Sequence, residues 1–210
     1  MASKKDVKIG VLALQGDVLE HLEMMDEVLK KKGIATKTVT VRRPDQLEGL
    51  TGLIIPGGES TVMSRLGSEK RFGKVLLEEI HNRVKNGLAV FGTCAGCIML
   101  AKDSSDKVVR DFTQELLGVM DITVVRNQYG RQQDSFELPL KIDGFDKNPF
   151  PGVFIRAPVI VSAKEEVEVL CRNANEIFAA KQGKILAVTF HPEITADTRF
   201  HDYFLKLVMS

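Results

Sequence analysis

Short apolar runs alternate with amphipathic segments through the first half of the chain. Lys8 to Leu14 is a mostly apolar run that predicts a buried strand. An amphipathic helix is expected from about Asp17 to Lys32, because apolar residues recur there at helical spacing (Val18, Leu22, Met25 and Leu29). The same alternation predicts three more strands and one more helix: strands at Ala35–Val41, Leu53–Ile55 and Leu88–Phe91, and a helix over about Lys70–Asn86. Apolar strands alternating with amphipathic helices indicate a parallel sheet covered on both faces.

From about Val119 the pattern changes to strand-like segments separated by turn residues, and helices are scarce until Thr198–Met209. This half should extend the sheet and add antiparallel hairpins. The expected fold is therefore α/β: a flavodoxin-like three-layer sandwich with a mostly parallel central sheet, in one domain over residues 1–210. The strand-like segments are Thr123–Val125, Ser135–Leu138, Gly152–Ile155, Val167–Leu170, Ile177–Ala180 and Ile185–Phe190.

Composition and charge narrow the class of protein. The 210 residues are 44% hydrophobic and 27% charged, which is typical of globular proteins. A net charge of +1 gives no electrostatic reason to expect nucleic acid or an anionic membrane as a partner. No apolar run approaches the roughly 18 residues of a membrane span, and the first residues lack the apolar core of a signal peptide. Three cysteines, an odd number, favour free thiols in a reducing cytoplasm.

Candidate chemistry begins at Gly92-Thr93-Cys94-Ala95-Gly96, which follows the apolar run Leu88–Phe91. Strand, sharp turn and helix in this order resemble a nucleophile elbow with cysteine in place of serine. The flanking glycines permit a tight turn, and the helix N-terminus that follows stabilises a thiolate and a developing oxyanion. The alternative is a glycine-rich turn with a buried cysteine. Cys97 completes a C-x-x-C spacing, but no second Cys/His pair stands at zinc-finger spacing, so no metal is expected.

A cysteine nucleophile needs a base and a group that orients the base. Of the four histidines, only His191 directly follows an apolar strand, so it should lie on the same sheet edge as Cys94. Glu193 lies two residues on, across Pro192, whose fixed φ should keep the tripeptide extended and project both side chains to one side. The sequence therefore predicts a catalytic triad of Cys94, His191 and Glu193.

These motifs resemble the class I, triad-type glutamine amidotransferases. Four further segments are similar to one branch, the glutaminase subunits of pyridoxal 5′-phosphate synthase complexes, and the resemblance runs from about Lys8 to the C-terminal helix. Those segments are Leu14-Gln15-Gly16, Pro56-Gly57-Gly58-Glu59-Ser60-Thr61, Arg126 to Gln132 and Phe154 to Pro158.

The resemblance implies that a set of residues contacts glutamine: Gly58, Glu59, Ser60, Arg126, Ile155 and Arg156. Backbone N–H groups of Gly57, Gly58 and Ala95 can form an oxyanion hole, because glycine peptides turn at little cost. Forked guanidinium donors suit a carboxylate, although either arginine could instead form a surface salt bridge. Gln15 and His21 belong to the site rim or partner surface by resemblance alone; otherwise they are ordinary polar residues.

The predicted function is hydrolysis of L-glutamine to glutamate and ammonia, without a cofactor. By resemblance, the ammonia passes to a barrel-fold synthase that makes pyridoxal 5′-phosphate (vitamin B6). Three alternatives stay open: an amidotransferase subunit of a different synthase, a non-catalytic regulatory protein on the same fold, and a cysteine peptidase or redox thiol protein.

Overall fold

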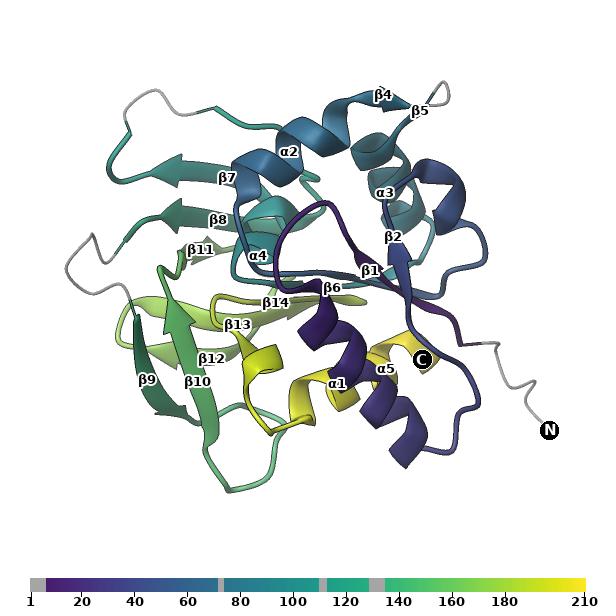
Figure 1. Ribbon diagram of the computed structural model, residues 1–210. Coiled ribbons are helices and arrows are strands. Elements are labelled where there is room, and N and C mark those ends of the chain that lie inside the picture. The colour runs from purple at the N-terminus through teal and green to yellow at the C-terminus, as the bar shows by residue number, and fades with distance from the viewer. Residues whose placement is uncertain (1–6, 72–73, 110–112, 129–134) are drawn as a thin grey trace.

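The computed structural model describes residues 7–71, 74–109, 113–128 and 135–210, with a ten-stranded sheet through its middle (Figure 1). Five parallel strands of this sheet lie in the order β2-β1-β3-β6-β14. Numbered among themselves along the chain, they have the flavodoxin-like order 2-1-3-4-5. The predicted fold class is therefore confirmed. The strands are β1 (Ile9–Leu12), β2 (Val39–Val41), β3 (Gly52–Ile55), β6 (Ala89–Thr93) and β14 (Ile185–Val188).

Antiparallel pairing extends the sheet beyond β14, as the second half of the sequence predicts. β13 pairs with β14, β11 with β13 and β8 with β11, all antiparallel, whereas β7 is parallel to β8. β12 forms a hairpin with β13, and β9 and β10 form a separate ribbon. These strands are β7 (Ala101–Asp106), β8 (Met120–Arg126), β9 (Ser135–Leu140), β10 (Phe150–Ile155), β11 (Val159–Ala163), β12 (Glu168–Asn173) and β13 (Glu176–Gln182).

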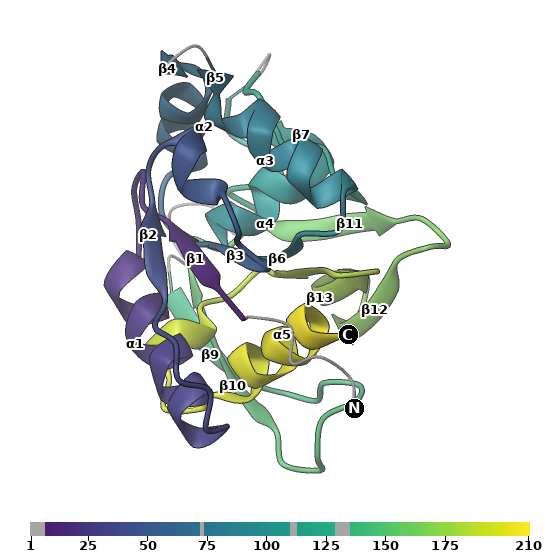
Figure 2. The ribbon, with the colours of Figure 1, turned by 90° about the vertical axis from the view of Figure 1, so that its right-hand side faces the viewer.

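Helices cover both faces of the sheet (Figure 2). α1 and α5 pack together on one face, near the β9–β10 ribbon, and α2, α3 and α4 lie on the other. All residues of β1, β3, β6 and β14 are buried, because these strands supply side chains to an apolar core on each face. The helices are α1 (Val18–Lys31), α2 (Ser60–Ser68), α3 (Leu76–Lys85), α4 (Ala95–Leu100) and α5 (Arg199–Met209), with 3-10 turns η1 (Pro44–Leu47) and η2 (Pro192–Ile194).

The segment between β3 and β6 differs from its prediction. The helix expected over Lys70–Asn86 begins only at Leu76, after a small hairpin of β4 (Lys70–Arg71) and β5 (Lys74–Val75). A further helix, α2, was not predicted, because its serine, threonine and glycine residues have low helix propensity. Packing stabilises it instead: Gly67 lies so close to α3 that a Cβ there would be 2.8 Å from the Leu77 side chain.

Two other strands escaped the sequence pattern, and one is shorter than expected. β7 has the polar sequence Ala-Lys-Asp-Ser-Ser-Asp and lies at the edge of the sheet, so apolar periodicity gives no signal there. β11 was also not predicted, although it begins with the short apolar triplet Val159–Val161. The strand predicted over Ala35–Val41 is confined to Val39–Val41, because β2 is the opposite edge and pairs only with the four-residue β1.

Candidate active site

Cys94 lies at a strained turn between β6 and α4. Its φ of 46° and ψ of −103° are unfavourable for a residue with a side chain, and its N–H donates a 2.9 Å hydrogen bond to the Val188 carbonyl. The neighbouring glycines serve close packing: a Cβ on Gly96 would lie 2.0 Å from the Ile55 carbonyl oxygen, and one on Gly92 would lie 2.6 Å from Gly96. The strained residue of this predicted elbow is thus the cysteine itself.

His191 follows β14 and lies on the same sheet edge as Cys94, as predicted. Its backbone N–H donates to the Val153 carbonyl over 2.8 Å, and its Nδ1 lies 2.7 Å from Glu193 Oε1. The predicted extended geometry was wrong, because Pro192 begins the 3-10 turn η2. The φ that proline imposes also suits the first position of a helical turn. His191 and Glu193 therefore meet across a tight turn.

Burial and charge set the protonation of this pair. Burial of the His191 ring disfavours its charged form, but hydrogen bonds with Asp17, Cys94 and Glu193 outweigh this and raise the pKa of His191 to about 12. Burial raises the pKa of Glu193, and the hydrogen bond with His191 opposes that rise. Both side chains are almost inaccessible, with 6% and 0% exposure. With its pKa raised to about 12, His191 is an imidazolium near neutral pH.

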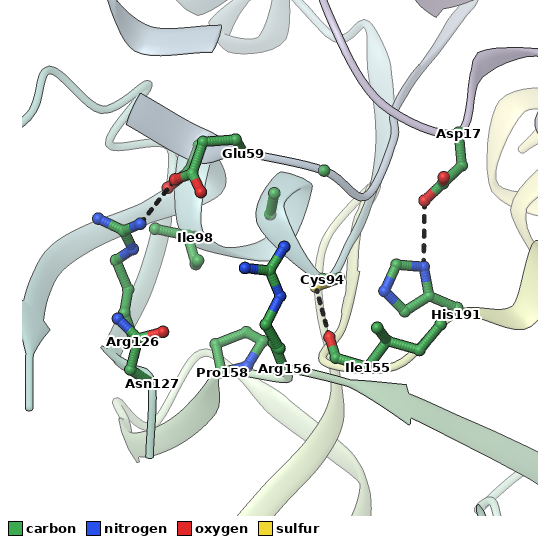
Figure 3. Close-up of a pocket in the computed structure, with 13 residues that line it drawn as sticks. Asp17, Glu59, Cys94, Ile98, Arg126, Asn127, Ile155, Arg156, Pro158 and His191 are labelled. Atoms are coloured by element: carbon green, nitrogen blue, oxygen red, sulfur yellow. Dashed lines mark hydrogen bonds and ion pairs between the residues drawn. The ribbon is translucent and has the colours of Figure 1, made fainter. Parts of the chain in front are cut away.

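A cavity of about 200 Å³ opens beside Cys94 and His191 (Figure 3). All six predicted substrate-binding residues line it, whereas Gly57 of the predicted oxyanion hole and Glu193 of the predicted triad do not. Of the predicted Arg126–Gln132 motif, residues 129–132 lie outside the described residues. The lining comprises Asp17, Gly58, Glu59, Ser60, Cys94, Ala95, Ile98, Arg126, Asn127, Ile155, Arg156, Pro158 and His191. Sequence reasoning missed Asp17, Ile98, Asn127 and Pro158.

Backbone strain is concentrated around this cavity. Among the described residues, four non-glycine residues have positive φ, and three of them line the cavity: Cys94 at 46°, Asn127 at 54° and Arg156 at 43°. Each such conformation costs of the order of 1–3 kcal/mol, and it persists where the surrounding structure fixes it. The strain marks this edge of the sheet as the functional region of the molecule.

Arg126 forms an ion pair with Glu59 on the cavity wall. Its Nη2 lies 2.8 Å from Glu59 Oε1 (Figure 3). Its Nη1 lies 3.7 Å from Asp106 Oδ2. The Arg126 side chain is only 11% exposed, whereas that of Glu59 is 41% exposed. The salt bridge that was the alternative reading of Arg126 is therefore present. It lies at the cavity, which both residues line.

The segment Gln15–Asp17 forms hydrogen bonds with the loop Gly57–Glu59, which includes the predicted oxyanion-hole glycines. Gln15 Oε1 accepts a 2.6 Å hydrogen bond from the Glu59 N–H, and the Gly57 carbonyl accepts one of 3.3 Å from the Asp17 N–H. Gly16 must be glycine, because a Cβ there would lie 1.7 Å from the Gly57 oxygen. Gln15 does not line the cavity, and it contacts the site through the Glu59 backbone.

His21 is neither at the site rim nor on a partner surface, so that expectation was wrong. It has no exposed surface and lies in the interior behind Glu193. The reason is its position in the first turn of α1, on the face that packs against the sheet and α5. Asp17, one turn earlier, is the residue of this segment that reaches the cavity.

Asp17 also contacts the predicted base directly. Its Oδ2 lies 3.3 Å from His191 Nδ1, the nitrogen that faces Glu193. With His191 and Glu193 it forms the single group of possible metal ligands found among the described residues. The contact between Nδ1 and Glu193 Oε1 is, however, a hydrogen bond of ordinary length, and the set fits acid–base chemistry.

Comparisons with known proteins show the family of this chain. Residues 11–210 match the SNO glutamine amidotransferase family. The chain belongs to that family. It is 48% identical to the pyridoxal 5′-phosphate synthase subunit PdxT of Thermotoga maritima over 96% of this chain and 100% of that one. It is 47% identical to PdxT of Pyrococcus furiosus, over 97% and 100%. A crystal structure described as a glutamine amidotransferase superposes with a TM-score of 0.81 at 47% identity, over 95% and 98% of the two chains.

Within the described part of this SNO family member, no helix has the length and apolar character that a membrane crossing requires.

Proposed function

We propose that this SNO family protein is the glutaminase subunit of a pyridoxal 5′-phosphate synthase, a single domain that hydrolyses L-glutamine to L-glutamate and ammonia. The observation that carries the proposal is the meeting of Cys94, at its strained turn, with the buried His191–Glu193 pair at one cavity. Relatives named PdxT that match nearly end to end at 46–48% identity support the choice of synthase.

Substrate binding uses the charged wall of the cavity. The α-carboxylate of glutamine is bound by the guanidinium groups of Arg126 and Arg156, and its α-amino group is bound by Glu59. Ser60 and Ile155 complete the wall beside the aliphatic part of the substrate. This arrangement directs the side-chain amide toward Cys94, at the sheet edge.

The first half-reaction forms a thioester. The Cys94 thiolate attacks the amide carbon, and the carbonyl oxygen becomes an oxyanion bound by two backbone N–H groups, that of Gly58 in the loop begun by Gly57 and that of Ala95 at the start of α4. The His191 imidazolium then donates its proton to the departing nitrogen. The carbon–nitrogen bond breaks, ammonia leaves, and His191 is neutral.

The second half-reaction releases glutamate. Neutral His191 takes a proton from water, and the resulting hydroxide attacks the thioester carbon. The carbon–sulfur bond breaks, the thiolate is restored, and His191 is again charged. Glu193 holds the His191 ring in one orientation and balances its charge throughout. The cycle uses only protein groups, glutamine and water.

The partner is by this proposal a barrel-fold synthase that consumes the ammonia. The three cysteines are free and buried in the structure, and the cytoplasm is the compartment that suits them.

A glutamine-analogue electrophile tests the proposal. Incubation should add one analogue to the intact protein, and peptide mapping should place it on Cys94, with protection by excess glutamine. The unlabelled protein should convert glutamine to ammonia and glutamate in equal amounts. Failure of the analogue to label Cys94 would favour a non-catalytic protein. Labelling of Cys94 in a protein that supplies ammonia to no pyridoxal 5′-phosphate synthase would favour an amidotransferase subunit of a different synthase. Cleavage of peptides or reduction of peroxide would favour a cysteine peptidase or a redox thiol protein.

A further inference from the structure

Two histidines that the proposed mechanism does not use lie in a buried row behind Glu193. His201 Nε2 in α5 lies 2.9 Å from His21 Nδ1 in α1. His21 Nε2 in turn lies 3.1 Å from Thr93 Oγ1 and 3.5 Å from Glu193 Oε2. His21, Thr93 and His201 have no exposed surface, and Glu193 is only 4% exposed. The row thus continues from α5 through α1 to the group that orients His191.

Burial keeps both of these histidines neutral. It lowers the pKa of His21 well below its ordinary value, to which the neighbouring His201 and His191 also contribute. Burial likewise lowers the pKa of His201 to about 3. A neutral imidazole carries one N–H and one bare nitrogen, so each ring donates in one direction only. The hydrogen bonds along the row can therefore run in either of two directions, and each direction is one setting of the two tautomers.

The charge of Glu193 selects between the two settings. If His21 carried its proton on Nδ1, its bare Nε2 would face the buried carboxylate, and the Nδ1–H of His201 would lack an acceptor among the described residues. If His201 donates from Nε2, His21 accepts at Nδ1 and donates from Nε2 toward Thr93 and Glu193. The second setting gives Glu193 Oε2 the donor that it otherwise lacks, and it leaves unpaired only an acceptor on His201.

We propose that His21 is a positioning residue for glutamine hydrolysis: its Nε2–H donates to Glu193 Oε2 and holds the carboxylate so that Oε1 faces His191 Nδ1. His201 fixes the tautomer of His21 in this arrangement, and Thr93 shares the same N–H. This inference rests on the proposed function, since it assigns Glu193 the role of orienting His191.

The surroundings hold the His21 ring in place. Phe91 packs against both rings in a T-shaped arrangement, with centroid distances of 6.3 Å to His21 and 5.5 Å to His201. α1 also brings Asp17 to His191 from the opposite end of its first turn. The 3.5 Å contact between His21 Nε2 and Glu193 Oε2 is longer than an ordinary hydrogen bond, as hydrogen bonds of catalytic sites often are in the absence of substrate. One helix thus supports both members of the His191–Glu193 pair.

Two substitutions at His21 distinguish the effect of its N–H donor from the effect of its side-chain volume. His21→Leu removes the N–H, whereas His21→Gln places an amide N–H near the position of Nε2. We expect His21→Leu to lower kcat for glutamine hydrolysis about 10- to 100-fold with KM within about twofold, and His21→Gln to recover most of the loss. His81→Gln is the control, because His81 bonds the Leu117 carbonyl away from this row. Equal activity of folded His21→Leu and the parent would overturn the proposal.

A double-mutant cycle distinguishes positioning from a general structural effect. If His21 acts through Glu193, His21→Leu should lower kcat by less than about threefold when Glu193→Gln is already present. A full loss in both backgrounds would overturn the proposal, because His21 would then act independently of Glu193.

The tautomer can be read in the unmodified protein, which avoids any variant that fails to fold. Nitrogen NMR of histidine-labelled full chain should show His21 neutral with its proton on Nε2 near pH 7. A proton on Nδ1 would overturn the proposal. This measurement needs no turnover, so it separates failure of this inference from failure of the proposed function, which labelling of Cys94 tests.

Discussion

His191 Nδ1 and Glu193 Oε1 lie 2.7 Å apart across one 3-10 turn, although only Pro192 separates the two residues in the chain. The backbone of the turn therefore brings the two side chains together, and Asp17 and His21 contact the pair from a distant part of the chain. Cys94 approaches from a different strand, so the third member depends on the pairing of β6 with β14.

Substitutions in this pair should have unequal effects. His191→Asn removes the group that transfers protons and should lower glutamine hydrolysis at least about 10³-fold. Glu193→Gln keeps the imidazole and should cost about 10²-fold, because orientation and charge balance are lost. Steady-state ammonia release measures both. Unchanged activity in Glu193→Gln would remove Glu193 from the mechanism.

The two cysteines of the C-x-x-C spacing should behave differently. Cys94→Ala should abolish ammonia release with the fold intact. Cys97→Ala should keep most activity and cost about 1 kcal/mol of stability, since Cys97 is fully buried in α4 and burial raises the pKa of its thiol. Activity assays together with thermal unfolding make the comparison. A similar loss of activity from both changes would favour a dithiol mechanism.

Asp17 should contribute to stability only above acidic pH. Its hydrogen bond with His191 lowers the pKa of Asp17 below the ordinary 3.8, while partial burial opposes this. A carboxylate with a lowered folded-state pKa stabilises the protein above its unfolded-state pKa, and that contribution is lost as the pH falls through the folded-state value.

Asp17→Asn should therefore lower the free energy of unfolding at pH 7 by less than about 1 kcal/mol, since the side chain is 37% exposed, and should have no effect well below pH 3.8. Urea unfolding across this range measures the difference. The His191→Asn background is the control, and an equal loss there would show that the contact with His191 is not the cause.

The isolated chain should be a poor glutaminase that its synthase partner activates. The Gly57 carbonyl accepts a hydrogen bond from the Asp17 N–H, and Gly58 has a φ of 136°, which glycine adopts readily. Rotation of this peptide on docking would re-aim the Gly58 N–H at the oxyanion. Since about 1.4 kcal/mol corresponds to tenfold in rate, we expect partner to raise ammonia release at least about tenfold.

Ammonia release at fixed enzyme concentration, titrated with the partner, measures this activation. A free chain that already works at full rate and does not respond to the partner would contradict the switch and leave an independent glutaminase.

The sequence by itself determined the alternating core of the fold and the strand ends that carry the chemistry. Apolar runs identified β1, β3, β6 and β14, because these strands are buried on both faces and their hydrophobicity is continuous. The glycines around Cys94 and the strand before His191 then predicted that the two residues share one sheet edge. These are local signals, so a single sequence contains them.

Tertiary structure alone decided the edges of the sheet and the layer behind the site. The polar strand β7 forms because β8 pairs with it, and the hydrophobic periodicity of the sequence does not predict that pairing. His21 and His201 are ordinary helical residues in the sequence, separated by 180 positions. They meet behind Glu193 because α1 and α5 pack on the same face of the sheet. Contacts between distant segments depend on how elements dock, and that information is spread over the whole core.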